Sequence, residues 1–316
     1  NTPAVAQTSF IYDGVATALQ IKPEGGVDHL IAPRRTVLDR VLVDAASTAG
    51  AKVRHGVTLQ ELVIGRSGQV TGCLLRDENG NVEVVHADLV IGADGRQSSV
   101  ARLVDAKVYR QGSNATGCVY GYFEGLTDKG FEWFFADGVA AGAIPTNDGQ
   151  HCVFTGVPGR DFAKIFRADP AAGFMRIAAA NSPDLAQALT QARRVDRFRA
   201  FGGVPGYMRQ SAGPGWALVG DAGYFKDPLT AHGITDAFRD AHLLARTIVR
   251  DGPANLGQYQ TMRDELSKDL FEITEEVASF EWDMEAIGAL HHRLSRVMKH
   301  ECAWLDNDLR PGAIAA

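Results

Sequence analysis

The sequence predicts an α/β (α+β) fold in which two strand-to-helix units flank a region of antiparallel strands and a helical segment follows. One buried-type strand, residues 217–219, ends at Gly220-Asp221, and apolar residues then recur at helical spacing from Ile234 onward. A second, residues 89–91, ends in Gly-Ala-Asp94-Gly95. Before the second of these strands, an amphipathic helix is expected over residues 36–46, a strand at residues 52–57 and a hairpin turn at residues 78–81. Between the two units, residues 107–206 alternate in the β sense around Gly, Pro and Asp turns, apart from helical stretches at residues 171–180 and 184–191. From residue 256 onward the spacing is helical.

The strand end at Asp221 is the most informative local pattern. A carboxylate there can accept hydrogen bonds from ligand hydroxyls, and the free N–H groups of the following helix start favour electron-rich ligand atoms. Gly223, Pro228 and Gly233 punctuate the loop between the two. This segment alone leaves open an ordinary junction in which Asp221 merely caps the helix.

Composition excludes several classes of function. The 316 residues are 45% hydrophobic and 22% charged, which is typical of a globular protein large enough for two domains. A net charge of −6 and the lack of a large Lys/Arg cluster argue against a nucleic-acid partner. No apolar run is long enough for a membrane span. The four cysteines match neither a disulfide framework nor a zinc site, so we expect a cytoplasmic protein without a metal centre.

Two motifs together carry a family resemblance. They read Val90-Ile-Gly-Ala-Asp94-Gly95-Arg-Gln-Ser98-Ser-Val-Ala-Arg102 and Gly220-Asp221-Ala222 followed by Pro228 and Gly233. In this order and separation they resemble the paired motifs of flavoprotein monooxygenases of the p-hydroxybenzoate hydroxylase type. The second motif looks closer to the geranylgeranyl-reductase-like and halogenase-like branch. A halogenase is disfavoured, because the W-x-W-x-I-P pattern of those enzymes is missing.

The resemblance implies a Rossmann-like FAD-binding domain with an inserted antiparallel-sheet substrate domain. No G-x-G-x-x-G turn follows a strand anywhere in the sequence, so the first βαβ unit of that domain is expected to lie outside it. The implied division is the first part of the FAD-binding domain at 1–106, the substrate domain at 107–206, the second FAD-binding part at 207–250 and C-terminal helices at 251–316.

The resemblance also assigns roles to residues. Asp221 would accept a hydrogen bond from the ribityl chain, Asp94 and Gly95 would lie along the pyrophosphate, and backbone groups near Val57 would contact the adenine. One of Arg34 and Arg35 would reach the flavin, unless the pair only forms a salt-bridged helix start. The predicted cofactor-binding residues are Arg34, Arg35, Val57, Asp94, Gly95, Gly220, Asp221, Pro228, Ala231, His232, Gly233 and Ile234, and the predicted catalytic residues are His232 and Gly233.

Backbone N–H groups around Ala231, His232 and Gly233 could stabilise negative charge on reduced flavin. His232 could add positive charge there, although a neutral surface histidine fits the sequence equally well. The predicted function is an NAD(P)H-dependent monooxygenase that hydroxylates an aromatic or polyketide-like molecule through a flavin hydroperoxide. The alternatives are a geranylgeranyl-reductase-like enzyme acting on C=C bonds and a non-catalytic, FAD-less scaffold. The substrate is expected to be small and apolar or aromatic, and a homodimer is left open.

Overall fold

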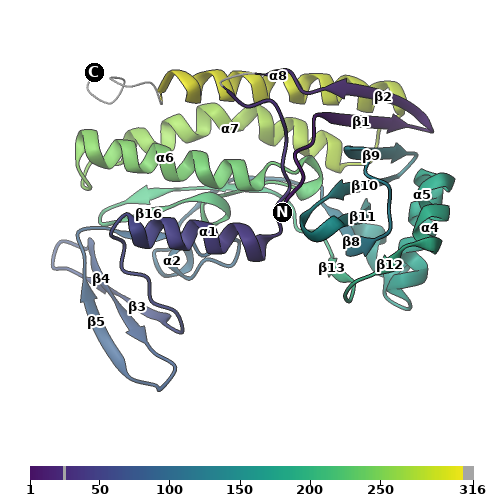
Figure 1. Cartoon of the computed structure of the whole chain (residues 1–316). Helices are drawn as coiled ribbons and strands as arrows, with labels where there is room; N and C mark the ends of the chain where they lie inside the picture. The colour runs from purple at the N-terminus through teal and green to yellow at the C-terminus, as the bar shows by residue number, and fades with distance from the viewer. Residues whose placement is uncertain (24–25, 309–316) are drawn as a thin grey trace. The chain divides into compact units, whose positions relative to one another are not determined.

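The computed structural model describes residues 1–23 and 26–308, which form two compact units (Figure 1). The first unit comprises residues 1–53, 114–204 and 276–292, and the second comprises residues 54–113, 205–275 and residues from 293 onward. Residues 1–53 group with 114–204 because strand β1 pairs with strand β9. The end of the expected helical segment, residues 309–316, lies outside the described part of the chain.

The first unit is built on a mixed, eight-stranded sheet. Its strand order is β12-β8-β11-β10-β9-β1-β2, with β13 also paired to β8. All pairs are antiparallel except β1 with β9, so the predicted antiparallel region is extended by a hairpin from the start of the chain. The strands are β1 (Gln7–Tyr12), β2 (Val15–Gln20), β8 (Thr116–Glu124), β9 (Phe131–Ala136), β10 (Val139–Pro145), β11 (Gln150–Pro158), β12 (Arg193–Arg194) and β13 (Arg199–Phe201).

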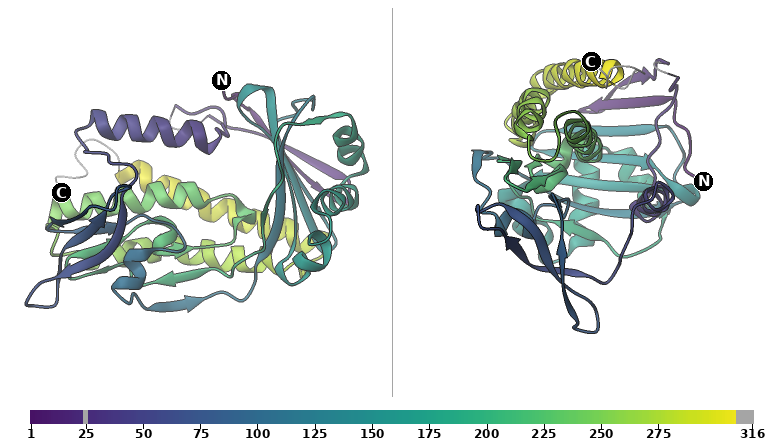
Figure 2. Two further views of the ribbon diagram at one scale, coloured as in Figure 1. Left: turned by 90° about the horizontal axis from the view of Figure 1, so that it is seen from below. Right: turned by 90° about the vertical axis from the view of Figure 1, so that its left-hand side faces the viewer.

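Helices cover one face of this sheet (Figure 2). Their start signals are clear for α4 (Pro170–Asn181) and α5 (Pro183–Gln191), where Asp169 and Ser182 accept hydrogen bonds from the first amides and Pro stands in the first turn. Helical spacing predicts both of these helices, whereas α3 (Gly159–Phe166) was not predicted, because it directly follows β11 and its N-cap residue Pro158 makes no side-chain cap hydrogen bond. Helix α1 (Arg35–Thr48) forms as expected, but none of its residues is buried.

The second unit contains three small sheets. The antiparallel sheet β3-β4-β5 contains the predicted hairpin turn at residues 78–81, between β4 and β5. The expected strand at residues 52–57 is wrong: no strand pairs with this segment, and Gly56 turns the chain with φ +67°. The strands are β3 (Thr58–Ile64), β4 (Val70–Arg76), β5 (Val82–His86), β6 (Val90–Gly92), β7 (Val108–Gln111), β14 (Tyr207–Arg209), β15 (Ala212–Gly213), β16 (Trp216–Leu218) and β17 (Tyr224–Phe225).

The long helices of the chain are α6 (Gly233–Asp251), α7 (Gly257–Ala278) and α8 (Met284–Asp308), and α2 (Ser99–Leu103) is short. In the second unit α6 packs on α7 through Leu243, Leu244 and Tyr259 (Figure 1). The sequence pattern placed the apolar residues of α6 on one stripe, yet Ile234 and Phe238 of that stripe are 46% and 48% exposed. The charged face of α6 is buried instead. No helix in residues 1–23 and 26–308 is long and apolar enough to cross a membrane.

His291 of α8 lies in an aromatic cluster of the first unit. The hydroxyl of Tyr12 lies 2.8 Å from His291 Nδ1, and the ring centroids of His291 and Phe135 are 4.5 Å apart. Burial lowers the pKa of His291 from 6.5 to about 4, with a smaller effect of His292 in the same direction. The folded protein therefore binds this proton more weakly than the unfolded chain.

Replacing His291 with Gln should remove part of the acid sensitivity of the fold. Because the unfolded chain binds the His291 proton below pH 6.5 and the folded protein only below about pH 4, stability is full above pH 6.5 and falls between these values. Between pH 7 and pH 4, we expect the free energy of unfolding of the wild type to fall by about 2–3 kcal/mol more than that of H291Q. Urea titrations at several pH values measure this, with His300→Gln, exposed on the same helix, as the control; equal slopes would contradict it.

Candidate cofactor site

Two predicted motif segments leave the same edge of one sheet. Strand β6 pairs in parallel with β16, with Val90 opposite Trp216 and Gly92 opposite Leu218. Because parallel strands share their carboxyl edge, the loop at Asp94 and the turn at Asp221 both begin there. The hydroxyl of Tyr207 donates to the carbonyl oxygen of Asp221 (2.6 Å) and lies 3.3 Å from that of Arg96. Tyr207 thus links the two segments.

The Asp94 carboxylate organises its own loop. It accepts hydrogen bonds from Ser98 Oγ (2.5 Å) and from the Ser99 amide (2.6 Å) at the start of α2. Ser98 is the N-cap of α2 and accepts from the Ala101 amide at 3.0 Å. Gly95 follows with φ +75°, and a Cβ atom added there would meet no atom within 4 Å. The backbone at Gly95 therefore has open space beside it.

The turn Gly220–Ala222 is a short 3₁₀ helix held against α6. Gly220 has φ +56°, and a Cβ there would lie 3.2 Å from the Cβ of Ala237. Its amide donates to Asp240 Oδ2 at 3.0 Å. A side chain at position 220 would be strained by both the backbone conformation and the close approach. Asp221, which is half-buried, therefore follows a residue whose backbone conformation is fixed.

The loop that precedes α6 leaves the start of that helix without a side-chain cap. A 3₁₀ turn at Pro228–Thr230 is capped by Asp227, and Ala231 adopts the left-handed conformation with φ +53°. His232 is the N-cap of α6 but makes no capping hydrogen bond with its side chain. The first amides of a helix lack intrahelical acceptors. Gly233 is exposed and a Cβ there would meet nothing within 4 Å, so the first turn of α6 has open space beside this residue.

The remaining predicted residues belong to other segments of the chain. Arg34 is in the first unit, where its guanidinium lies 3.9 Å over the ring of Tyr122 and donates to Gln150 at 3.0 Å. Arg35 is exposed and pairs with Asp39, one turn along α1. Val57 precedes β3, outside any strand. A role of these three residues at the cofactor stays a prediction.

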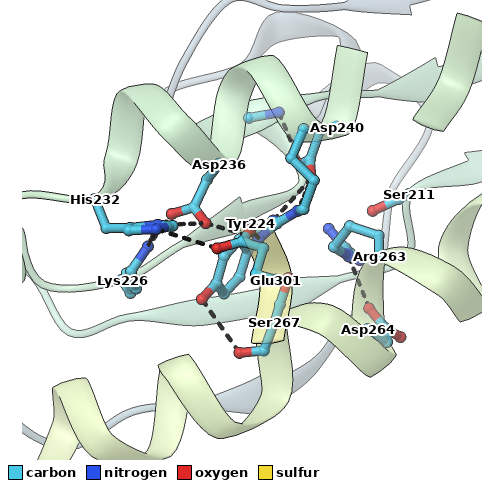
Figure 3. Close-up of polar contacts among 12 residues, drawn as sticks. Ser211, Tyr224, Lys226, His232, Asp236, Asp240, Arg263, Asp264, Ser267 and Glu301 are labelled. Atoms are coloured by element: carbon cyan, nitrogen blue, oxygen red, sulfur yellow. Dashed lines mark hydrogen bonds and ion pairs between the residues drawn. The ribbon is translucent and has the colours of Figure 1, made fainter. Parts of the chain in front are cut away.

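Behind the start of α6 lies a buried ionic network that the sequence pattern did not reveal (Figure 3). It consists of Lys226, His232, Asp236, Arg239, Asp240 and Glu301, all less than 6% exposed. Arg239 lies at the centre: Nη1 donates to Asp236 (2.9 Å) and to Glu301 (2.7 Å), and Nη2 donates to Asp240 (2.9 Å). The signal was present in the sequence, because positions 236, 239 and 240 share a helix face with the apolar residues Leu243 and Leu244.

Asp240 connects this network to the turn at Gly220 through the hydrogen bond to its amide. At the other side, His232 Nε2 lies 3.1 Å from Glu301 and Nδ1 lies 3.3 Å from Asp236. Lys226 contacts Asp236 directly. The network therefore joins both backbone segments that the resemblance places at the flavin: the turn before Asp221 and the start of α6.

Burial sets the electrostatics of these groups. It lowers the pKa of Lys226 to about 7 and lowers that of His232, where Glu301 acts in the opposite direction. Burial alone would raise the pKa of Glu301, but the hydrogen bond from His232 and the charge of Arg239 bring it below its ordinary value. His232, Asp236 and Glu301 offer ligand atoms within 4.8 Å of one another. Because Lys226 and Arg239 already bind these carboxylates, a divalent cation would meet two positive charges.

The fold and this edge define an α/β protein that binds a nucleotide at the ends of parallel strands. Residues 24–273 match the family described as FAD binding domain, and the chain belongs to that family. This confirms the flavoprotein resemblance and the predicted fold class, and FAD is the cofactor. The open backbone at Gly95, the fixed turn at Gly220 and the uncapped start of α6 are compatible with an elongated anionic nucleotide.

Sequence relatives agree with this family, and solved structures share the fold. The chain is 30% identical over 244 residues to a digeranylgeranylglycerophospholipid reductase from Methanosarcina mazei, covering 75% of this chain and 56% of that protein. The chain thus spans about half the length of the curated relatives it matches. Flavin-dependent brominase Bmp2 superposes with a TM-score of 0.75 at 16% identity, over 87% of this chain and 71% of that one. A flavoprotein/dehydrogenase from Cytophaga hutchinsonii gives 0.74 at 17%, over 86% and 68%.

Removing the central cation of the network should destabilise the protein strongly. In Arg239→Met, the carboxylates of Asp236, Asp240 and Glu301 remain buried without their shared partner. We expect the free energy of unfolding to fall by about 3–5 kcal/mol, as for other broken buried ion pairs. Chemical denaturation measures it. Arg250→Met, at the exposed end of the same helix, is the matched control and should unfold like the wild type. Equal stability of the two variants would show that the network is not held by Arg239.

Proposed function

We propose that the protein is an FAD-dependent oxidoreductase whose cofactor lies along the carboxyl edge of β6 and β16. The observation that carries this is the uncapped, exposed start of α6 beside the turn that holds Asp221, at the edge where the Asp94 loop also begins. When bound, FAD supplies hydride and electron transfer that side chains cannot perform. The amides at Gly233 and Ile234 would bind its electron-rich end, and Asp221 would accept from a sugar hydroxyl.

We further propose that the substrate is a small apolar molecule bound on the first unit's sheet. One face of that sheet packs against helices through residues such as Val119, Phe123 and Val153. Alternating residues point to the opposite face, which carries half-buried aromatic side chains. The Trp133 and Phe154 rings there are 6.0 Å apart, and Gly142 leaves room for the Phe154 ring. Such a wall suits an apolar ligand. The aromatic residues of this face are Tyr120, Tyr122, Trp133 and Phe154.

Two reactions fit this arrangement. Reduction of C=C bonds is favoured by the curated relatives, which are named digeranylgeranylglycerophospholipid reductases. Hydroxylation of an aromatic molecule is the second candidate, favoured by the aromatic sheet face. We place the reductase first, because those relatives share up to 30% of the aligned residues, whereas the solved structures of brominases and monooxygenases share only the fold. In both cases NAD(P)H is the proposed reductant and the cytoplasm the proposed location.

Turnover of protein expressed from its complete gene distinguishes these reactions. For a reductase, we expect anaerobic NAD(P)H oxidation that depends on an unsaturated isoprenoid lipid and yields a product heavier by two hydrogens per saturated bond. For a monooxygenase, NAD(P)H oxidation should consume oxygen and yield a product heavier by one oxygen atom. Mass spectrometry and an oxygen electrode measure both. A colourless preparation that takes up no added FAD would contradict either enzyme and support the scaffold alternative.

Filling the open space at the start of α6 should interfere with the cofactor and not with folding. In Gly233→Val the new Cβ would meet no protein atom within 4 Å, so the fold should persist while the amides become less accessible. We expect at least about a tenfold weaker FAD affinity, measured by flavin fluorescence during titration. Gly257→Val is the matched control, because Gly257 also begins a long helix with open space around it. Identical FAD affinities of the two variants would place the flavin elsewhere.

A further inference from the structure

His232 differs from an ordinary N-cap residue because its side chain turns into the protein (Figure 3). It is 5% exposed, although Ala231 and Gly233 on either side of it are exposed. Its Nε2 lies 3.1 Å from Glu301, and its Nδ1 lies 3.3 Å from Asp236 and 3.4 Å from the ammonium nitrogen of Lys226. A neutral imidazole can donate to only one of the two carboxylates, whereas an imidazolium donates to both. A carboxylate therefore lies near each ring nitrogen, although a neutral His232 carries a proton on only one of them.

The charge of the network leaves room for this proton. With Lys226 and Arg239 protonated, three carboxylates face two cations, so the network carries one excess negative charge when His232 is neutral. Protonation of His232 brings the sum to zero. Loss of the Lys226 proton would only increase the negative excess.

The groups that face His232 come from three elements. Lys226 precedes the 3₁₀ turn and lies 3.4 Å from Nδ1. Asp236 and Arg239 come from α6, and Glu301 comes from α8. Burial lowers the pKa of His232, Lys226 and Arg239 act in the same direction, and Glu301 opposes them. His232 is thus neutral at neutral pH without a ligand, and a new negative charge nearby would favour its protonation.

Such a charge would arise at the proposed cofactor site. The backbone of His232 directly precedes the first amides of α6, which lie beside the open space where the electron-rich end of the flavin would bind. We propose that His232 is the proton-binding partner of the flavin, taking up one proton from solvent when the cofactor is reduced. This inference rests on the proposed function, because it requires FAD at the start of α6.

The reaction is balanced. A hydride from NAD(P)H brings two electrons and one proton to the flavin, leaving NAD(P)⁺ and an anionic reduced flavin. One further proton passes from solvent to His232 and converts the imidazole to imidazolium, and no bond of the polypeptide changes. His232 would then hold positive charge beside the reduced cofactor through Glu301 and Asp236. Reoxidation of the flavin would release this proton.

The number of protons taken up per two electrons tests the proposal. FAD-loaded protein expressed from its complete gene is titrated electrochemically at several pH values. The slope of the midpoint potential against pH then gives the number of protons taken up per two electrons. We expect about two protons near pH 7 for the wild type and about one for His232→Gln, which keeps hydrogen bonding but cannot titrate. His242→Gln, on the same helix and paired with Asp308 outside the network, is the matched control and should behave like the wild type.

Each outcome has a distinct meaning. One proton in the wild type throughout, or two in His232→Gln, overturns the proposal; the second result would assign the proton to another group such as Lys226. Absence of bound flavin, seen in the absorption spectrum before any titration, overturns the proposed function instead. If His232→Gln fails to retain FAD, NMR of wild-type protein labelled at its histidines tests the proposal instead. A shift of one buried imidazole from neutral to imidazolium on reduction supports the proposal, and unchanged histidine signals overturn it.

Discussion

The parallel pairing of β6 with β16 is the constraint on which the candidate site depends. Both strands are short, and their contact is close: a Cβ at Gly92 would lie 2.7 Å from Leu218 and 2.8 Å from Val100. Ala217 and Leu218 are completely buried. Because this pairing sets Gly92 opposite Leu218, the Asp94 loop and the Asp221 turn leave the sheet at neighbouring points. Two motifs distant in sequence become one site through this contact.

The buried network gives the start of α6 its rigidity. Burying charges is unfavourable unless each one is paired and hydrogen-bonded, and Arg239 satisfies three carboxylates at once. Tyr224 is fully buried beside it, with the guanidinium carbons of Arg239 and Arg263 at 5.6 and 5.8 Å from its ring centroid. The consequence is that α6 hides its charged face. The exposed helix start and the fixed turn at Gly220 are held by one set of ionic contacts.

The family and the reaction rest on different kinds of observation. The family match covers residues 24–273 and brings FAD with it. Brominases, dehydrogenases and reductases share this fold, so the fold alone does not select a reaction. The selection depends on what binds beside the flavin and how charge on the flavin is balanced. The network around His232 is the feature of this chain that bears on the second question.

The sequence by itself determined the elements with strong local signals: the capped helices α4 and α5, the hairpin turn at residues 78–81, the strands β8 to β11 and the motif glycines. These depend on periodicity, caps and turn residues that lie within a few positions of one another. The sequence could not predict that β1 joins the sheet of β9, or that residues 52–57 lack a strand partner. It also missed the ionic network, since Glu301 of α8 is far along the chain from Lys226 and Arg239. Only tertiary packing decides whether a charged side chain is exposed to water or buried against a distant partner.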